Sequence, residues 1–285
     1  MPGAGDEMRG LAKVVWYWAK SGTRQWRIAS LGDRMPFVPE ALRYRYLVLE
    51  RPNYAYGVQR AVDAARRQGH CGVTVIEFGV AGGNGLLALE RHARYFSART
   101  GVAVDVVGFD SGSGLPAPTD YRDQPFRWAE GYYPMDEEAL RARLDGAELI
   151  LGDISSTVGS WLSEHESRLH GAPIGFIAFD LDFWSSTVAA FDLFRRQSLL
   201  HLLPRVLCYF DDIVYSIAAI GELRAISELN AEMEGRMSIG RVEGLRAGIP
   251  LDPPWADQIF EAHLFEHPHY LRTVESSPTD LPLRA

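Results

Sequence analysis

The chain has 285 residues, of which 47% are hydrophobic and 23% are charged, a composition that excludes a disordered or fibrous protein. Its 37 acidic residues outnumber its 29 basic residues, giving a net charge of −8, which argues against a nucleic-acid partner because binding phosphates needs a basic surface. No apolar stretch approaches the roughly 20 residues of a membrane span, and no secretion signal opens the chain. We therefore expect a cytoplasmic protein without a membrane partner.

The first 66 residues are predicted to form a helical segment rich in aromatic side chains. Trp16, Trp18 and Trp26 lie in it, ahead of several tyrosines. This segment is either an amphipathic appendage packed on the main domain or a lid that supplies aromatic walls to a ligand pocket. Residues 67–275 are expected to form the main domain, and residues 276–285 are expected to be a disordered tail.

From residue 73 onwards, short apolar runs alternate with helical stretches. Strands are predicted at residues 73–80, 102–110, 147–154, 174–182 and 205–213, and weaker ones near 238–246 and 258–267. Helices are predicted at residues 84–100, 136–145, 185–203 and 217–234. Such alternation is typical of crossover units, so we predict an α/β fold: a doubly wound, mainly parallel, seven-stranded Rossmann-like sheet with helices on both faces.

A glycine-rich loop joins the first predicted strand to the helix that follows it. The loop reads Glu77-Phe-Gly-Val-Ala-Gly-Gly-Asn-Gly85. Its glycines, which let the main chain turn tightly and let a ligand lie against it, are Gly79, Gly82, Gly83 and Gly85. Their spacing differs from that of the dinucleotide fingerprint. The acidic Glu77 suits a ligand with a positively charged amino group rather than a pyrophosphate.

Two aspartates end the next two predicted strands. Asp110 can accept hydrogen bonds from both hydroxyls of a ribose, and Asp153 can meet an adenine amino group. In sheets of this type, ligands bind beyond the carboxyl ends of the strands. The loop and these two aspartates outline an adenosine with a charged amino-acid tail, which predicts S-adenosylmethionine as the cofactor. The alternative is three ordinary turns at strand ends.

Four more aspartates end the fourth and fifth predicted strands. Asp180 and Asp182 lie two residues apart and point to the same side, and Asp211 and Asp212 are adjacent. Converging carboxylates repel one another, and a hard divalent cation such as Mg²⁺ or Ca²⁺, which prefers oxygen ligands, would relieve the repulsion. Alternatively, these carboxylates are simply hydrated or paired with arginines.

These motifs resemble those of the macrocin O-methyltransferase-type family, which consists of class I, metal-dependent S-adenosylmethionine methyltransferases. The resemblance covers about residues 56–267. It rests on Glu77–Gly85, Gly-Phe-Asp-Ser-Gly-Ser-Gly-Leu-Pro at 108–116, Leu151-Gly-Asp153, Phe179-Asp-Leu-Asp-Phe-Trp-Ser-Ser-Thr187, Phe210-Asp-Asp-Ile213 and Gly221-Glu222. The chain departs from the family in having Trp184 where a tyrosine is usual.

The resemblance implies roles for individual residues. The implied metal ligands, for Mg²⁺ or another hard divalent cation, are Asp180, Asp211 and Asp212. Either Asp180 or Asp182 would help to deprotonate the acceptor. The implied contacts to the cofactor are Glu77, Gly79, Asp110 and Asp153.

We therefore expect an S-adenosylmethionine-dependent, metal-assisted O-methyltransferase of natural-product biosynthesis. Its partner would be a small-molecule hydroxyl acceptor, either a sugar or an aromatic compound, and a homo-oligomer is compatible with the sequence. The aromatic residues Trp128, Tyr132, Tyr133 and Trp184 would stack on the acceptor or pack in the core and loops. The alternatives are a metal-dependent glycosyltransferase using Asp180-Leu-Asp182, a related metal-dependent hydroxylase, and a non-catalytic cofactor-binding subunit.

Overall fold

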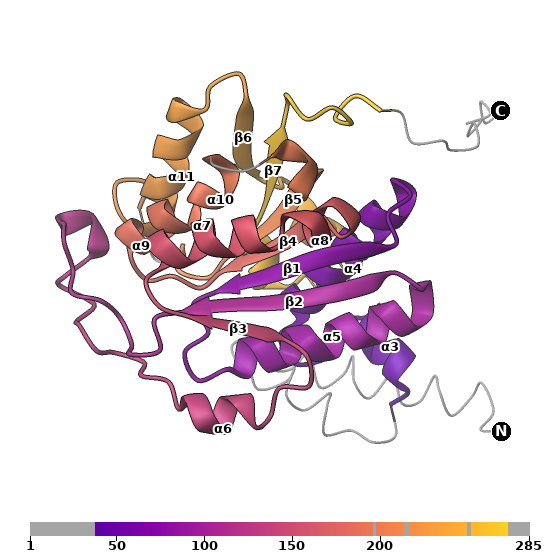
Figure 1. Cartoon of the computed structure of the whole chain (residues 1–285), viewed down its shortest axis with the longest axis horizontal. Coiled ribbons are helices and arrows are strands. Elements are labelled where there is room, and N and C mark those ends of the chain that lie inside the picture. Colours follow the sequence, from indigo (N-terminus) through magenta and orange to yellow (C-terminus); the bar gives the residue numbers. More distant parts are fainter. Residues whose placement is uncertain (1–37, 196–197, 214–216, 250–251, 273–285) are drawn as a thin grey trace.

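The computed structural model describes residues 38–272, except 196–197, 214–216 and 250–251 (Figure 1). The predicted tail at residues 276–285 and the first 37 residues of the predicted N-terminal segment lie outside the described residues. Within the described part, every helix is too short or too polar to cross a membrane.

A seven-stranded sheet forms the centre of the described chain, with the strand order β3-β2-β1-β4-β5-β7-β6. Its strands are β1 (Gly72–Phe78), β2 (Ala103–Asp110), β3 (Glu148–Leu151), β4 (Ile174–Phe179), β5 (Leu202–Phe210), β6 (Met237–Arg241) and β7 (Ile259–Leu264). The first five strands are parallel, and β7 runs antiparallel to both of its neighbours. The prediction of a mainly parallel, seven-stranded sheet is confirmed.

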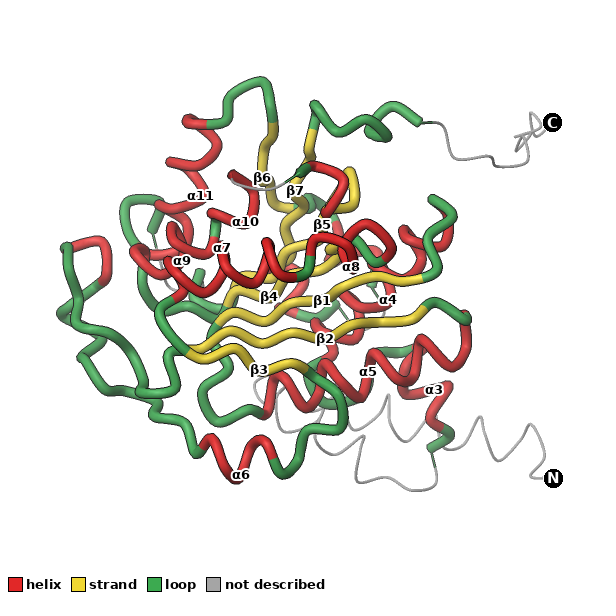
Figure 2. Tube along the Cα trace, in the orientation of Figure 1, coloured by secondary structure: helices red, strands yellow, loops and turns green. Residues whose placement is uncertain are grey.

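Helices cover both faces of this sheet. They are α3 (Glu40–Arg45), α4 (Pro52–Arg67), α5 (Asn84–Thr100), α6 (Glu137–Arg141), α7 (Ile154–Glu164), α8 (Glu166–Gly171), α9 (Trp184–Ala190), α10 (Asp192–Arg195), α11 (Gly221–Glu232) and α12 (Leu245–Gly248). Short 3₁₀ helices are η1 (Tyr121–Asp123), η2 (Leu199–His201) and η3 (Pro254–Gln258). Figure 2 shows the parallel strands side by side, with the long loop that follows β2 extending past their ends.

Two hydrophobic cores lie on opposite sides of the sheet, because successive side chains of a strand point to opposite faces. In β1, Val73 and Val75 belong to the core that includes side chains of α4 and α5, whereas Ile76 and Phe78 belong to the core that includes side chains of α7 and α11. The core that contains Phe78 has stacked aromatic rings at its centre. The Phe179 ring of β4 stacks on Phe78 of β1 and on Phe210 of β5. The predicted coverage of both faces by helices is thus observed.

Helix α4 belongs to the core layer of the domain. Its buried side chains, including Tyr54, Val58 and Val62, pack against the sheet, and a Cβ at Gly57 would overlap the ring of Phe176. The predicted boundary at residue 66 therefore falls one residue before the end of this helix.

Several predicted elements differ from those observed. The single helix predicted over residues 185–203 is wrong: its described residues form α9, α10, η2 and the start of β5, because the chain turns to bury Phe191 and Phe194. The fifth strand, predicted to run to residue 213, ends at Phe210. Asp211 and Asp212 consequently leave the sheet at its carboxyl edge. Residues 154–171, where the sequence pattern predicts no element, form α7 and α8.

Candidate active site

A cavity of about 850 Å³ lies beyond the carboxyl ends of the five parallel strands, where the loops after β1 to β5 meet. All the residues predicted to bind cofactor or metal, or to act in catalysis, line it: Glu77, Gly79, Gly82, Gly83, Gly85, Asp110, Asp153, Asp180, Asp182, Asp211 and Asp212. Clefts at this edge are the usual ligand sites of doubly wound sheets. The structure therefore brings the two predicted constellations together in one space.

The glycine-rich loop is shaped by contacts within the chain. Gly79 has φ +86°, and a Cβ there would overlap the main-chain oxygen of Asp180. A Cβ at Gly85 would overlap the Glu77 carboxylate, so this helix start can lie directly over that side chain. Gly82 differs, since a Cβ there would meet only open space. Of these three glycines, only Gly82 could carry a side chain without overlapping the rest of the chain.

Glu77 is a buried carboxylate at the cavity wall. The side chain is 1% exposed, and its Oε1 accepts a hydrogen bond from the Tyr54 hydroxyl at 2.7 Å. Its Oε2 is buried and has no hydrogen-bond partner among the described residues. Burial raises the pKa of Glu77 to about 8, although the Tyr54 hydrogen bond and the charge of Arg51 act in the opposite direction. A cationic amino group in the cavity would satisfy Oε2 and favour the ionised carboxylate.

Asp110 ties two loops of the cavity together. Its Oδ2 accepts hydrogen bonds from the amides of Val80 and Ala81, both at 2.8 Å, and its Oδ1 accepts one from the Gly112 amide at 2.7 Å. A carboxylate has about four lone-pair sites, and these three amides use three of them, so acceptor capacity remains for one ligand hydroxyl. Asp110 thus shapes the loop whether or not a ribose is bound.

Asp153 caps the N-terminus of α7. Its Oδ1 accepts hydrogen bonds from the Ser155 amide at 2.8 Å and from the Ser155 hydroxyl at 2.6 Å. These two bonds lower the pKa of Asp153, so the carboxylate is charged at neutral pH. Its position on the cavity wall is compatible with the predicted contact to adenine.

Three carboxylates form a compact acidic cluster, which we define as Asp180, Asp211 and Asp212. One oxygen from each lies within 4.8 Å of the other two. Burial, followed by repulsion from Asp211, raises the pKa of Asp180 well above its ordinary value. Burial and the charges of Asp182 and Asp211 raise the pKa of Asp212 to about 8. Oxygen donors with excess negative charge are a suitable ligand set for a hard divalent cation.

Asp182 lies beside the acidic cluster and lines the same cavity, but the close triplet of oxygens does not include it. Burial raises its pKa to about 6, while the charge of Arg127 acts in the opposite direction. The structure thus separates the two aspartates that the sequence left equivalent: Asp180 belongs to the cluster, and Asp182 stands next to it.

Sequence reasoning missed two residues, Arg51, which lines the cavity, and Tyr54, which is buried behind Glu77. Arg51 reaches the acidic cluster, with its Nη1 3.6 Å from Oδ2 of Asp180. Its guanidinium also lies over the Tyr54 ring, 5.3 Å from the centroid, while the Tyr54 hydroxyl is bonded to Glu77. The expectation of carboxylates paired with arginine is therefore met in part, at Asp180. Only the tertiary fold shows that Arg51 and Tyr54 reach the site, because both lie in the predicted N-terminal segment, far from the other site residues in the sequence.

Two further residues orient the acidic cluster. The Tyr209 hydroxyl donates a hydrogen bond to Oδ1 of Asp211. Oε2 of the fully buried Glu222 accepts one from the Asp212 amide at 2.9 Å. Glu222 lies in Gly221-Glu222, one of the stretches that carry the resemblance, whereas the strand pattern presents Tyr209 as an ordinary core aromatic.

Three of the four predicted stacking aromatics, Trp128, Tyr132 and Tyr133, line the cavity. Trp184 has a different place: its Nε1 donates to Oε2 of Glu228 at 2.7 Å, and the Arg122 guanidinium lies over its ring at 3.4 Å. Trp184 does not line the cavity, so the prediction that it stacks on the acceptor is wrong. Its side chain packs between η1 and α11.

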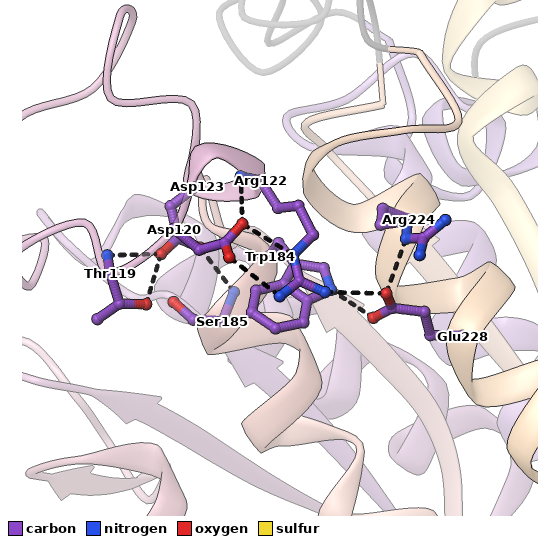
Figure 3. A network of polar contacts seen from close by, with 8 residues as sticks. All are labelled: Thr119, Asp120, Arg122, Asp123, Trp184, Ser185, Arg224 and Glu228. Atoms are coloured by element: carbon purple, nitrogen blue, oxygen red, sulfur yellow. Dashed lines mark hydrogen bonds and ion pairs between the residues drawn. The ribbon is translucent and has the colours of Figure 1, made fainter.

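Figure 3 shows the polar network around Trp184. Arg122 bonds to Asp120 in its own loop and to Oε1 of Glu228 in α11 at 3.0 Å. Asp123 accepts hydrogen bonds from Thr119 and from the Ser185 amide of α9. These contacts attach the long loop after β2, which supplies the aromatic wall of the cavity, to two helices of the domain.

The chain matches no protein-family model and no curated protein. Among solved structures, it is similar to CalS11, a calicheamicin methyltransferase, with 17% identity, 84% of this chain and 90% of that chain covered, and a TM-score of 0.52. The fold is that of a class I methyltransferase.

Two other structures are similar at a lower level. An apo structure of CalS11, described as a TDP-rhamnose 3'-O-methyltransferase, has 17% identity, coverage of 84% and 92%, and a TM-score of 0.43. Cofactor-bound Rv0187 from MTB has 14% identity, coverage of 88% and 96%, and a TM-score of 0.39.

Proposed function

We propose that this protein is an S-adenosylmethionine-dependent O-methyltransferase that methylates a hydroxyl of a sugar or aromatic small molecule with the help of a divalent cation. One observation carries the proposal: a single cavity is lined both by the Glu77–Gly85 loop with Asp110 and by the acidic cluster. Methyl transfer needs a cofactor and an acceptor oxygen held side by side, and a shared cavity meets this requirement.

The chain's own groups match the parts of the cofactor. Oε2 of Glu77, which has no hydrogen-bond partner among the described residues, would accept from the amino group. Asp110 would use its remaining lone pair for a ribose hydroxyl. Asp153, at the end of β3, would meet the adenine. The fold shared with CalS11 supports methyl transfer as the reaction class, by analogy of fold.

The acidic cluster would hold Mg²⁺ or another hard divalent cation through Asp180, Asp211 and Asp212. When bound, such a cation supplies Lewis acidity that lowers the pKa of an acceptor hydroxyl. Tyr209 and Glu222 keep Asp211 and Asp212 oriented.

Asp182 would accept the proton that the acceptor hydroxyl loses. With a pKa of about 6, it is mostly ionised at neutral pH and close to the optimum for a general base. The aromatic wall of Trp128, Tyr132 and Tyr133 would exclude water and pack against the acceptor's ring. This wall favours a sugar or aromatic compound, consistent with the resemblance to macrocin-type enzymes and with a role in natural-product biosynthesis.

Calorimetric titration tests this proposal against a nucleotide-sugar enzyme. S-adenosylmethionine and UDP-sugars are titrated separately into the protein, with and without Mg²⁺. Saturable binding of S-adenosylmethionine at one site per chain, with no heat from UDP-sugars, is the expected result. Binding of UDP-sugars in the presence of Mg²⁺, with no binding of S-adenosylmethionine, would replace the proposal with a glycosyltransferase.

A further inference from the structure

A second group of metal-ligating side chains lies far from the cavity, at the amino ends of the central strands. Glu166 and His170 come from α8, which precedes β4, and His201 comes from η2, which immediately precedes β5. One ligand atom from each lies within 4.8 Å of the other two. The whole of β5 separates His201 from Asp211, a length of roughly 30 Å at about 3.3 Å per residue.

The spacing within α8 suits a shared ligand. Glu166 and His170 are four residues apart on the helix, so their side chains lie on the same face, one turn apart. Both are exposed, which gives an ion access from solvent. The third residue, His201, comes from the neighbouring strand connection. Leu202, which follows His201, pairs with Ile174 at the start of β4, and this pairing places His201 close to α8.

His201 is the observation that calls for a ligand. The residue is 4% exposed, yet neither Nδ1 nor Nε2 has a hydrogen-bond partner among the described residues. A buried polar nitrogen without a partner is costly, and native proteins rarely leave one. The His201 ring lies against that of His170, with centroids 4.8 Å apart and ring planes at 81°, and one of its nitrogens is within 4.8 Å of ligand atoms of both Glu166 and His170.

We propose that Glu166, His170 and His201 bind a borderline transition-metal ion, with Zn²⁺ as the best match. Two imidazoles and one carboxylate are a typical zinc ligand set, whereas Mg²⁺ prefers oxygen ligands alone. The fourth position would hold water. The ion would join α8 to η2 and so connect the starts of β4 and β5, at a site separate from the acidic cluster in ligand chemistry and in place.

The test measures metal binding by the full chain. Chelator-treated protein is titrated with Zn²⁺, and separately with Co²⁺ as a spectroscopic probe, both in excess Mg²⁺ to fill oxygen-only sites. We expect a zinc-to-chain ratio near one, a rise in melting temperature, and the strong visible absorption of four-coordinate Co²⁺. The variant His170→Ala, at an exposed position, and the variant His201→Gln should lose all three.

The matched control is His70→Gln, a half-buried histidine in the turn before β1, outside the group. It should keep zinc binding and the Co²⁺ spectrum. Two results would overturn the proposal: no zinc bound by the wild-type chain, or zinc bound equally by the wild type and His170→Ala. Neither result bears on S-adenosylmethionine binding, so the proposed function is tested independently.

Discussion

Replacing Glu77 by Gln is expected to remove recognition of the cofactor's amino group while leaving the fold intact. Gln has nearly the same shape, so it fits beneath Gly85 and can keep the hydrogen bond from the Tyr54 hydroxyl. The position of Oε2, unpaired among the described residues, would then carry amide hydrogens and point a donor at a cationic ligand. The substitution thus turns an attractive contact into an unfavourable one.

The magnitude follows from the chemistry of this contact. A hydrogen bond to a charged group contributes about 1.5–3 kcal/mol, so affinity for S-adenosylhomocysteine should fall about 10- to 150-fold. The wild-type affinity should also rise with pH, because the amino group needs the ionised form and the pKa of Glu77 is raised to about 8. Between pH 7 and 8 the ionised fraction of Glu77 grows about fivefold, and affinity should follow it. The variant should show no such rise.

The assay compares two ligands by calorimetry: S-adenosylhomocysteine and its analogue with hydrogen in place of the amino group. Glu77→Gln should weaken the first and leave the second nearly unchanged. Glu90→Gln is the matched control, since Glu90 is 5% exposed and its Oε1 accepts the amides of Asp145 and Ala147, away from the cavity. Equal loss for both ligands in Glu77→Gln, or no loss at all, would refute the assignment of the amino group to Glu77.

Three other perturbations test separate parts of the molecule. Asp211→Asn removes one charge from the acidic cluster, so half-maximal activity should need at least about tenfold more Mg²⁺, while the affinity for S-adenosylhomocysteine is nearly kept. Full activity of the wild-type protein after exhaustive chelation would contradict a role for the cation. Gly79→Ala should destabilise the fold by about 1–3 kcal/mol in urea unfolding, because its φ is +86° and its Cβ would overlap the Asp180 carbonyl. The control Gly82→Ala, with open space around its Cβ, should unfold like the wild type, and equal stabilities of the two variants would oppose this account of the loop. Burial lowers the pKa of His92 to about 3, so below about pH 6.5 the unfolded state takes up a proton that the folded state does not, and the free energy of unfolding should fall by about 2 kcal/mol between pH 7 and 5. Denaturation of His92→Gln at both pH values should lack this part of the decrease, and an unchanged pH dependence would show that other groups cause it.

The strand ends were predictable because a parallel sheet buried on both faces needs continuous apolar strands. The first polar residue after such a run marks the edge of the sheet, and Asp110, Asp180 and Asp211 each follow one directly or end it. Parallel strands bring their carboxyl ends to the same edge, so residues 100 positions apart in sequence can be placed in one site. This reasoning needs no knowledge of side-chain contacts.

The supporting residues could not be predicted in this way. Tyr54 and Tyr209 have the pattern of core aromatics, and only the alignment of α4 and β5 shows that their hydroxyls meet Glu77 and Asp211. Arg51 sits at φ +48°, outside any periodic element, so nothing local indicates that it reaches Asp180.

The broken helix near residue 191 has a related cause. Its helical periodicity is genuine, but burial of Phe191 and Phe194 against the sheet overrides local propensity. Tertiary packing decides both this break and the partners of the site residues, and single-sequence patterns carry no information about it.

The most direct test of the central claim is a crystal structure with S-adenosylhomocysteine and Mn²⁺, an ion that prefers the same oxygen ligands as Mg²⁺ and scatters anomalously. The account predicts the amino group of the ligand at Glu77, its ribose at Asp110, and an anomalous peak among Asp180, Asp211 and Asp212, all in one cavity. Ligand density elsewhere on the chain, or no Mn²⁺ peak at the acidic cluster, would contradict it.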